Sequence, residues 1–533
     1  MTKIRGVLVG AIVALVAATV MPTSHADLTP RPTIVRVEAE SATQAAFLMN
    51  NFDETHNHSA GEIELLLWPG DRAQLDQLGY HYEVVTEDLF ADDMKEGTAS
   101  PVPLSIPGPD LQDYRRLPDY NNEMKTLAKD KPSLVKLFKL PHLTLEGRST
   151  FGVEIGANVK DADGRPVFYM DGVHHAREWP ASEYSMLYIH HLVEGFGKDA
   201  QITKLLKKAR VIVIPIVNVD GFNYTRESVF SYNQALRDGT SNMGAGNGFE
   251  GYWRKNRRSL TGVTTPEAQI NPDAYGVDPN RNYSYLWGDT QGGSSSSQVA
   301  QTYRGEAPFS EPEPTNVRDL ILGRAVTGVI TNHTYQGSVL RAGGGFAPDE
   351  NMLRKLGDKM AVALKYRNAA TVGYPTTGTT DDWAYYSMGA LGFTIEHGVL
   401  GFHPAYDREV GAFWKEHMKA FTIMLEASAN PQYHSILKGK VANGPAKLRI
   451  TKTYTQPLSP GNPIGKPSVK EKIDWSLTTE KNGSFTWHIT PSKRPESKKA
   501  EPYTLTITAG GKSKTRQINI VRGQVLNLGS IRL

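Results

Sequence analysis

The pattern of apolar and polar residues divides the chain into three stretches with different periodicities. In the first, short apolar runs alternate with segments whose apolar residues recur at helical spacing. The predicted elements in chain order are a strand at 33–37, a helix at 41–51, a strand at 62–68, a helix at 71–78 and a strand at 80–85. This order predicts a small α/β domain over residues 27–97.

A segment rich in Pro, Gly and Ser follows at 98–109. Such a composition is typical of a stiff, exposed linker. We therefore expect a linker over residues 98–110 and a separate domain after it.

The second stretch, 111–430, alternates continuous apolar runs with helical patterns. Runs such as 167–170, 211–217 and 325–330 are typical of strands buried on both faces, and hence of a largely parallel sheet covered by helices. In the third stretch, 431–533, short alternating strands between turns rich in Gly, Pro and Lys predict a β-sandwich. Its expected strands include 446–450, 484–489, 503–508 and 515–521. The fold class is therefore α/β, with a mixed, largely parallel twisted sheet between a small α/β domain and a β-sandwich.

The composition removes several classes of function. Lys plus Arg number 59 and Asp plus Glu 56 in 533 residues, a formal net charge of +3, and no five like charges occur in a row, which argues against a nucleic-acid binder. Cysteine is absent, so any metal must be held by His and carboxylate side chains. No Gly-x-Ser-x-Gly motif is present, which counts against a serine hydrolase.

The longest apolar run lies at the start of the chain. Two basic residues precede the run at 7–21, and small residues stand three and one positions before Asp27. This arrangement is typical of a secretory signal peptide over residues 1–26. The run is shorter than the roughly 20 residues that a membrane span needs, so an uncleaved anchor is the weaker alternative. We expect a secreted mature chain without a membrane span.

Candidate metal ligands follow two of the predicted buried strands. His175 and Glu178 come after the run at 167–170, and His333 comes after the run that ends at Ile330. Ligands bind in open α/β sheets at the carboxyl ends of strands, and two histidines with one carboxylate are a combination found in catalytic zinc sites. Taken alone, the pair His175 and Glu178 is a weak signal, and a solvated or hydrogen-bonded pair without a metal is the more common interpretation.

Seven segments in a fixed order connect the chain to a known family. They are 145–149 (LEGRS), 175–179 (HAREW), 215–221 (PIVNVDG), 253–257 (WRKNR), 276–282 (GVDPNRN), 333–336 (HTYQ) and 393–396 (FTIE). In these segments the chain resembles the zinc metallocarboxypeptidases of the pancreatic carboxypeptidase A/B type. The resemblance implies hydrolysis of the C-terminal peptide bond of peptides and proteins that carry a free C-terminal carboxylate.

The resemblance also implies the reacting groups. His175, Glu178 and His333 would hold one Zn²⁺ in the catalytic domain, with a fourth position open to water. Glu396 would activate this zinc-bound water as a general base. Arg254 would stabilise the negative oxygen of the tetrahedral intermediate.

One residue is implied behind the first ligand, and one competes with it. Asp278 would hold the other ring nitrogen of His175 and fix its tautomer. His174 directly precedes the expected ligand and is an alternative to it, although the three-residue spacing to Glu178 favours His175.

Substrate-binding residues follow from the same resemblance. Arg281 with Asn280 matches the family's clamp for the C-terminal carboxylate, in which a guanidinium forms a bidentate pair. Tyr374 matches the family's mobile tyrosine. Arg177 and Tyr335 lie inside the matching segments and would contribute to nearby subsites.

Specificity depends on one acid. Asp381 stands where carboxypeptidases of the B type carry an acid at the pocket floor, which implies a preference for C-terminal Lys or Arg, because a buried carboxylate needs a partner. If Asp381 instead faces solvent or pairs internally, the pocket accepts apolar side chains or both kinds. A catalytically silent, peptide-binding module is a further alternative.

The flanking domains are interpreted by position. The N-terminal domain loosely resembles the family's pro-region, which covers the active-site mouth until it is cleaved, so we expect a zymogen. A retained accessory domain is the alternative. The C-terminal sandwich resembles the transthyretin-like modules that follow some carboxypeptidase domains.

Overall fold

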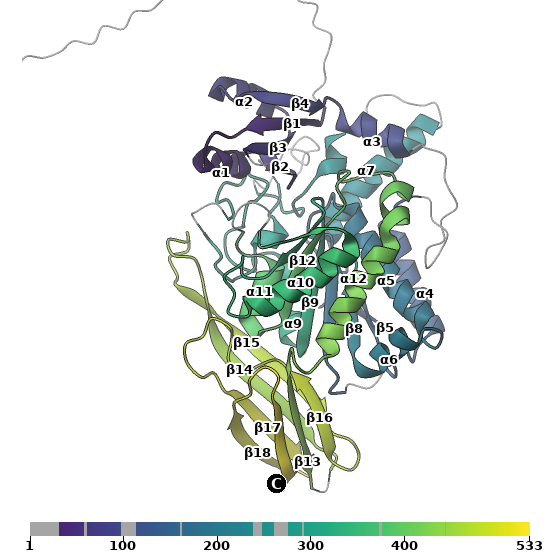
Figure 1. Ribbon diagram of the computed structural model, residues 1–533, viewed down its shortest axis with the longest axis vertical. Coiled ribbons are helices and arrows are strands. Elements are labelled where there is room, and N and C mark those ends of the chain that lie inside the picture. The colour runs from purple at the N-terminus through teal and green to yellow at the C-terminus, as the bar shows by residue number, and fades with distance from the viewer. Residues whose placement is uncertain are drawn as a thin grey trace, which may run out of the picture.

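A computed structural model describes residues 31–57, 61–97, 113–159, 163–237, 248–260, 275–289, 293–371, 376–442 and 444–533 (Figure 1). The predicted signal peptide at 1–26 and the linker at 98–110 lie outside the described residues, as does Tyr374.

The N-terminal domain is a four-stranded antiparallel sheet in the order β2-β3-β1-β4, flanked by helices. Its elements are β1 Thr33–Glu38, α1 Ala42–Asn51, β2 Asp53–Glu54, β3 Glu62–Leu67, α2 Asp71–Leu78, β4 Tyr82–Thr86 and α3 Leu89–Gly97. Alternate residues Val35 and Val37 of β1 and Leu65 of β3 form its core. Helix α1 begins where the Ser41 side chain accepts a hydrogen bond from the Gln44 amide. The two-residue strand β2 and helix α3 are additions to the pattern predicted from the sequence.

The central domain contains an eight-stranded mixed sheet in the order β11-β10-β12-β9-β7-β8-β6-β5. Its strands are β5 Val135–Lys139, β6 Phe151–Ile155, β7 Val167–Gly172, β8 Arg210–Ile214, β9 Val326–Thr334, β10 Ser338–Arg341, β11 Arg367–Ala369 and β12 Leu391–His397. The four central strands, β12, β9, β7 and β8, are parallel. Every residue of β7, β8, β9 and β12 is buried, as the continuous apolar runs predict.

Helices cover both faces of this sheet (Figure 1). They are α4 Leu117–Asp130, α5 Trp179–Gly195, α6 Ala200–Lys208, α7 Val219–Arg237, α9 Pro312–Leu322, α10 Glu350–Leu364, α11 Thr380–Met388 and α12 Ala412–Ala429, with short turns η1 Phe249–Tyr252, η2 Pro279–Arg281 and η3 Asp407–Gly411. Phe168 and Met170 of β7 face the core that contains α5 and α12. The alternate residues Val167 and Tyr169 face a second core, shared by α9, α11 and the C-terminal domain.

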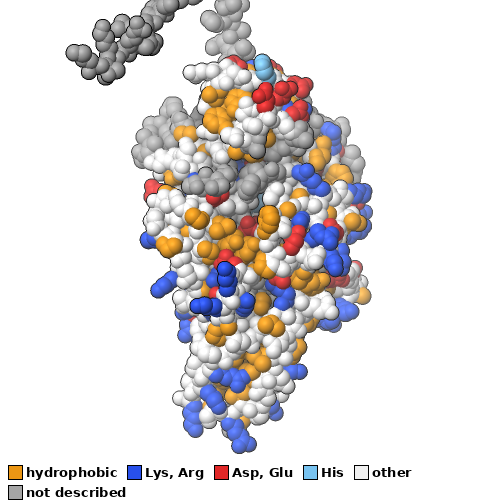
Figure 2. All heavy atoms as spheres, turned by 60° about the vertical axis from the view of Figure 1, so that its left-hand side comes forward, with side chains coloured by type: hydrophobic (Ala, Val, Ile, Leu, Met, Phe, Trp, Pro, Cys, Tyr) orange, Lys and Arg blue, Asp and Glu red, His pale blue; other side chains and the backbone are white. Residues whose placement is uncertain are grey.

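The C-terminal domain pairs a three-stranded sheet, β16-β13-β19, with a four-stranded sheet, β15-β14-β17-β18. Its strands are β13 Ser435–Val441, β14 Lys447–Pro457, β15 Ser468–Thr478, β16 Ser484–Ile489, β17 Tyr503–Ala509, β18 Lys512–Ile518 and β19 Val525–Ile531. The strand predicted at 515–521 begins three residues earlier, because exposed Lys and Arg side chains fill β18 and hide its start. Figure 2 shows basic side chains at this tip of the molecule.

The described helices were also compared with the dimensions of a lipid bilayer. None of them is both long and apolar enough to cross a membrane.

Candidate functional site

The candidate metal ligands and the candidate base lie at one edge of the sheet, where three neighbouring parallel strands end. His175 follows the end of β7, His333 lies near the end of β9, and Glu396 lies near the end of β12. Glu396 is the register partner of His333, and Gly172 of β7 is the register partner of Asn332. Because parallel strands present their carboxyl ends together, residues far apart in sequence meet here.

Three donor atoms converge at this edge. Nδ1 of His175 lies 2.6 Å from Oε1 of Glu178, and Nδ1 of His333 lies 2.9 Å from Oε2 of the same carboxylate. The two Nδ1 atoms are 3.2 Å apart. One donor atom of each residue lies within 4.8 Å of the others, and all three side chains are buried. Two tetrahedral zinc ligands at about 2.0–2.1 Å from the metal would be roughly 3.4 Å apart, so the two Nδ1 atoms at 3.2 Å suit one zinc ion. The Glu178 oxygens, at 2.6 and 2.9 Å from these nitrogens, lie at hydrogen-bond distance and would move outward to bind it.

The protonation of His175 supports this fit. Its Nε2 lies 3.1 Å from Oδ1 of Asp278, so this nitrogen carries the proton and donates. Burial lowers the pKa of His175, and the charge of Arg254 lowers it further, which favours the neutral ring. A neutral ring with a proton on Nε2 presents a lone pair at Nδ1. This electron pair faces a carboxylate oxygen of Glu178 in a buried site, and a cation between the two atoms resolves their repulsion.

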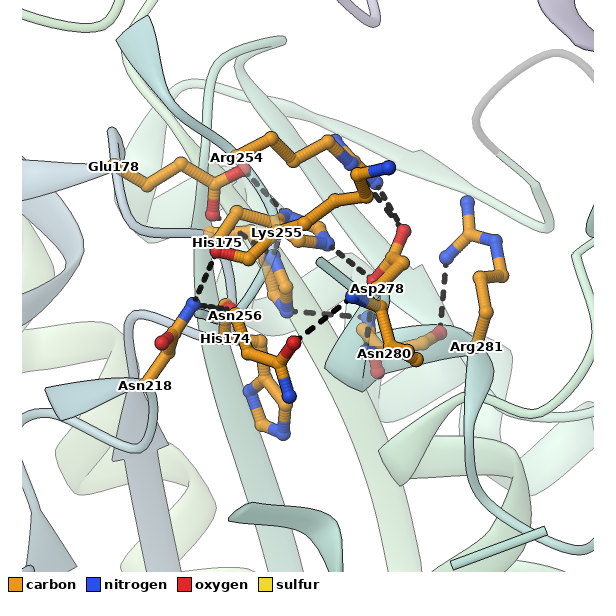
Figure 3. Close-up of polar contacts among 12 residues, drawn as sticks. His174, His175, Glu178, Asn218, Arg254, Lys255, Asn256, Asp278, Asn280 and Arg281 are labelled. Atoms are coloured by element: carbon orange, nitrogen blue, oxygen red, sulfur yellow. Dashed lines mark hydrogen bonds and ion pairs between the residues drawn. The ribbon is translucent and has the colours of Figure 1, made fainter. Parts of the chain in front are cut away.

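Asp278 links this ligand to a cation. Oδ2 of Asp278 accepts a hydrogen bond of 2.9 Å from a terminal nitrogen of Arg254 (Figure 3). Although burial raises the pKa of Asp278, the charge of Arg254 and the hydrogen bond from His175 hold it well below its usual range. Its Oδ1 also accepts a hydrogen bond of 2.8 Å from the backbone amide of Asn280, and in this way Asp278 caps the short helix η2. The carboxylate therefore stays ionised and fixes three groups of the site at once.

His174 is directed away from the three converging atoms. Its Nε2 lies 2.8 Å from the Tyr283 hydroxyl and 2.9 Å from the Thr380 hydroxyl. The amide of Asn218 donates to the backbone carbonyls of His174 and Lys255, at 3.1 and 3.0 Å, and so fixes the segment that carries the ligands (Figure 3).

The predicted carboxylate clamp lies beside the same cluster. The Asn280 amide nitrogen is 3.3 Å from Nε2 of His333, and its oxygen accepts hydrogen bonds from the backbone amide and the hydroxyl of Thr380, at 3.0 and 3.1 Å. The Arg281 guanidinium donates to the Asn280 carbonyl at 3.0 Å. These contacts tie η2 to the first turn of α11.

A cavity of about 400 Å³ joins these groups. Its lining includes His175, Asn280, Arg281, Asp381 and Glu396. Burial raises the pKa of Asp381. A buried acid that lines a cavity gains from a cationic partner.

A second acid, Asp382, also lines the cavity and accepts a hydrogen bond of 2.6 Å from the Gly343 amide. Burial, together with the charge of Asp381, raises the pKa of Asp382 to about 8. The resemblance did not single out this residue, although it directly follows Asp381 in the sequence.

The N-terminal domain contacts two of the predicted substrate-binding residues. Asp53 forms a bidentate ion pair with Arg177, with N–O distances of 2.5 and 2.8 Å, and both side chains are buried. The Tyr335 hydroxyl donates to Glu64 at 3.0 Å. The indole of Trp68 also donates to Asp53, at 2.9 Å.

His56 of the N-terminal domain reaches the candidate base. Its Nδ1 lies 3.7 Å from Oε1 of Glu396, and its Nε2 lies 2.9 Å from Oε1 of Glu54. Burial lowers the pKa of His56, but the two carboxylates outweigh burial and raise it to about 10. The ring is therefore an imidazolium, held between two acids, that also lines the cavity. Asp53, His56 and Glu64 were not predicted, because a contact between domains leaves no local pattern in a sequence.

Comparisons with known proteins agree with this geometry. Residues 120–420, more than half of the chain, match the profile of the family described as zinc carboxypeptidase. Human carboxypeptidase B is 28% identical over 284 residues, which cover 51% of this chain and 59% of that protein. Rat carboxypeptidase A1 is 27% identical over 350 residues, 62% of this chain and 75% of that protein.

Solved structures show the same fold. Carboxypeptidase A from Helicoverpa armigera matches with a TM-score of 0.61 and 21% identity, over 75% of this chain and 98% of that one. Thrombin activatable fibrinolysis inhibitor matches with a TM-score of 0.57 and 20% identity, over 75% of this chain and 99% of that one. On the matched central domain, with its buried group of two histidines and one glutamate, the chain belongs to the zinc carboxypeptidase family.

Proposed function

We propose that this chain is the secreted precursor of a zinc-dependent carboxypeptidase that removes single residues from the C-terminus of peptides and proteins. The observation that carries the proposal is that one cavity is lined by His175, Glu396 and Arg281, the candidate metal ligand, base and carboxylate clamp. An exopeptidase needs a fixed cation that recognises the free C-terminal carboxylate of its substrate, whereas an endopeptidase does not.

Each reacting group has a separate task in this proposal. His175, Glu178 and His333 hold the zinc ion, which when bound polarises the scissile carbonyl and lowers the pKa of water. Glu396 accepts the proton of the attacking water and passes it to the leaving amine. Arg254, kept charged and oriented by Asp278, stabilises the negative oxygen that develops at the scissile carbonyl.

Arg281 and Asn280 determine which peptide bond of the substrate is cleaved. A guanidinium binds a carboxylate through two parallel hydrogen bonds, and a substrate without that charge forms neither of them. The clamp lies next to His333, so a bound C-terminus places its last peptide bond near the metal ligands.

Asp381 supports a preference for C-terminal Lys or Arg. It lines the same cavity as the clamp, and a basic side chain would supply the partner that its burial calls for. The alternative is a broad or apolar preference. The rates of release from peptides that end in Arg and from peptides that end in Phe distinguish a basic preference from a broad or apolar one.

The N-terminal domain keeps the precursor inactive in this proposal. Asp53 neutralises Arg177, and His56 forms an ion pair with Glu396, so the base cannot accept a proton from water while the domain is docked. Secretion rests on the apolar segment at 1–26, and activation on cleavage between residues 98 and 110, both of which lie outside the described residues.

The proposal is tested by a release assay on the chain after cleavage at 98–110. We expect release of C-terminal amino acids from peptides with a free carboxylate, loss of release with a chelator, and recovery with Zn²⁺. Amidated peptides should be spared. The variant Glu396→Gln should keep its zinc and lose about 10²- to 10⁴-fold in kcat. Release from amidated peptides at the same rate would contradict the proposal.

A further inference from the structure

The C-terminal sandwich packs directly behind the substrate cavity. The Leu286 amide donates to the Pro457 carbonyl at 3.1 Å, and the Ser459 amide donates to the Trp287 carbonyl at 3.0 Å. Ser459 itself lines the cavity. The sandwich therefore reaches the loop that follows the carboxylate clamp, and its core is continuous with one face of the central sheet.

One carboxylate of the sandwich bridges two segments of the catalytic domain. Glu471 of β15 is buried, with 6% of its surface exposed. Its oxygens lie 3.1 and 3.2 Å from the indole nitrogen of Trp383 and accept a hydrogen bond from the Ser284 hydroxyl. A third donor, the Tyr454 hydroxyl, lies 2.6 Å away inside the sandwich.

The two bridged segments are those that carry substrate recognition. Ser284 stands three residues after Arg281, and Trp383 stands two residues after Asp381 in α11. The segments also pair through their backbones, since the Tyr283 amide donates to the Gly378 carbonyl at 3.0 Å. Glu471 binds both paired segments, through Ser284 and Trp383. Its position therefore affects the distance between Arg281 of the clamp and Asp381 of the pocket.

The geometry of the bridge is that of an acceptor surrounded by donors. Burial raises the pKa of Glu471 above its usual value, and the hydrogen bonds from Ser284, Tyr454 and Trp383 offset part of this rise. A carboxylate accepts from all three donors, whereas an amide in its place would turn one acceptor into a donor that faces other donors. Such a network of hydrogen bonds fixes the orientation of the Ser284, Tyr454 and Trp383 side chains.

From this geometry we infer that Glu471 is a positioning residue for substrate recognition, so that the C-terminal sandwich forms part of the substrate pocket. Glu471 holds Ser284 and Trp383, and through them it sets the spacing between Arg281 and Asp381. This inference rests on the proposed carboxypeptidase function.

The test compares variants of the full chain after cleavage at 98–110. For Glu471→Ala we expect KM for peptides that end in Arg to rise about tenfold, with kcat changed less than about threefold and zinc content unchanged. Glu471→Gln keeps the shape and one acceptor, so its KM should lie between those of wild type and Glu471→Ala. Ser284→Ala removes one donor from the other side and should raise KM in the same direction.

The matched control is Thr479→Val. Thr479 is also buried, and its hydroxyl accepts a hydrogen bond of 2.9 Å from the Ala446 amide at the end of β15 away from the cavity. This variant should lower the melting temperature without changing KM. If Glu471→Ala folds with a lowered melting temperature but an unchanged KM, or if it does not fold and Ser284→Ala leaves KM unchanged, the inference is overturned. If wild type itself releases no C-terminal residue, the proposed function fails instead.

Discussion

Nδ1 of His56, in the N-terminal domain, lies 3.7 Å from a carboxylate oxygen of Glu396, in the centre of the catalytic domain. The contact is buried, and the same imidazole is held on its other side by Glu54. The proposed base of the enzyme is therefore already engaged by a cation of its own chain, and this relationship makes autoinhibition testable at the level of single residues.

The first prediction concerns release of that inhibition. Asp53→Ala removes the buried partner of Arg177, and truncating one member of such a pair costs about 2–5 kcal/mol of docking free energy. We expect the uncleaved variant to show at least about tenfold more activity than the uncleaved wild type. Arg72→Ala is the control, because Arg72 pairs with Glu87 on the exposed side of the same domain. Equal activity of both variants would count against the domain as an inhibitor.

The second prediction concerns pH. The pKa of His56 is about 10 in the docked state and about 6.5 when the ring is free in water. Because docking raises the pKa of His56, the protonated ring stabilises the docked state in full below pH 6.5. This stabilisation is lost as the pH rises from 6.5 to 10, by up to about 1.4 kcal/mol for each pH unit. The melting temperature of His56→Gln should fall short of wild type by more at pH 6 than at pH 9.5. A difference that does not change with pH would show that the imidazolium is not the stabilising form.

The third prediction concerns the metal. His333→Ala leaves only two of the three converging ligands, so zinc measured after dialysis should fall well below one ion per chain. Asp278→Asn keeps the ligands but weakens the hydrogen bond that orients His175, and should lower zinc affinity about 10- to 100-fold. His174→Gln is the control, since His174 is bonded to Tyr283 and Thr380, and it should retain the metal. Zinc loss in this control alone would reassign the ligand.

The fourth prediction concerns specificity. Asp381→Asn removes the charge at the pocket floor while it keeps the volume, so the ratio of kcat/KM for peptides ending in Arg over those ending in Phe should fall at least about tenfold, or about 1.4 kcal/mol. Asp382→Asn should change this ratio less, because the Asp382 oxygen is engaged by the Gly343 amide. A ratio that follows Asp382 and not Asp381 would exchange their roles.

Much of the catalytic domain could be predicted from the sequence because its signals are local. The runs that became β7, β8 and β9 are continuous and apolar, since both faces of each strand are buried. The ligand motifs stand directly after two of those runs. Parallel strands then bring them to one edge, so their place after buried strands, together with the resemblance to the carboxypeptidase family, predicted the convergence of His175, Glu178 and His333.

The remainder depends on contacts that no local pattern encodes. Asp53 and His56 lie in a short segment of ordinary composition, and their partners are more than a hundred residues away. Strand β15 was not among the strands named from the sequence, and charged residues at its outward positions interrupt its apolar run. Glu471 shares the inward face of β15 with Ile473 and Trp475, but a charge interrupts the apolar pattern there, and its contact with Trp383 of α11 becomes visible only in the folded chain.

The register between β9 and β12 determines where the candidate base lies relative to the metal ligand His333. His333 and Glu396 are register partners on adjacent strands, and successive side chains of a strand point to opposite faces. A slip of one residue between these strands would keep nearly every backbone hydrogen bond and yet send the base to the wrong side of the sheet. Catalytic competence should therefore report on the correctness of strand pairing more sharply than any measure of helix or sheet content.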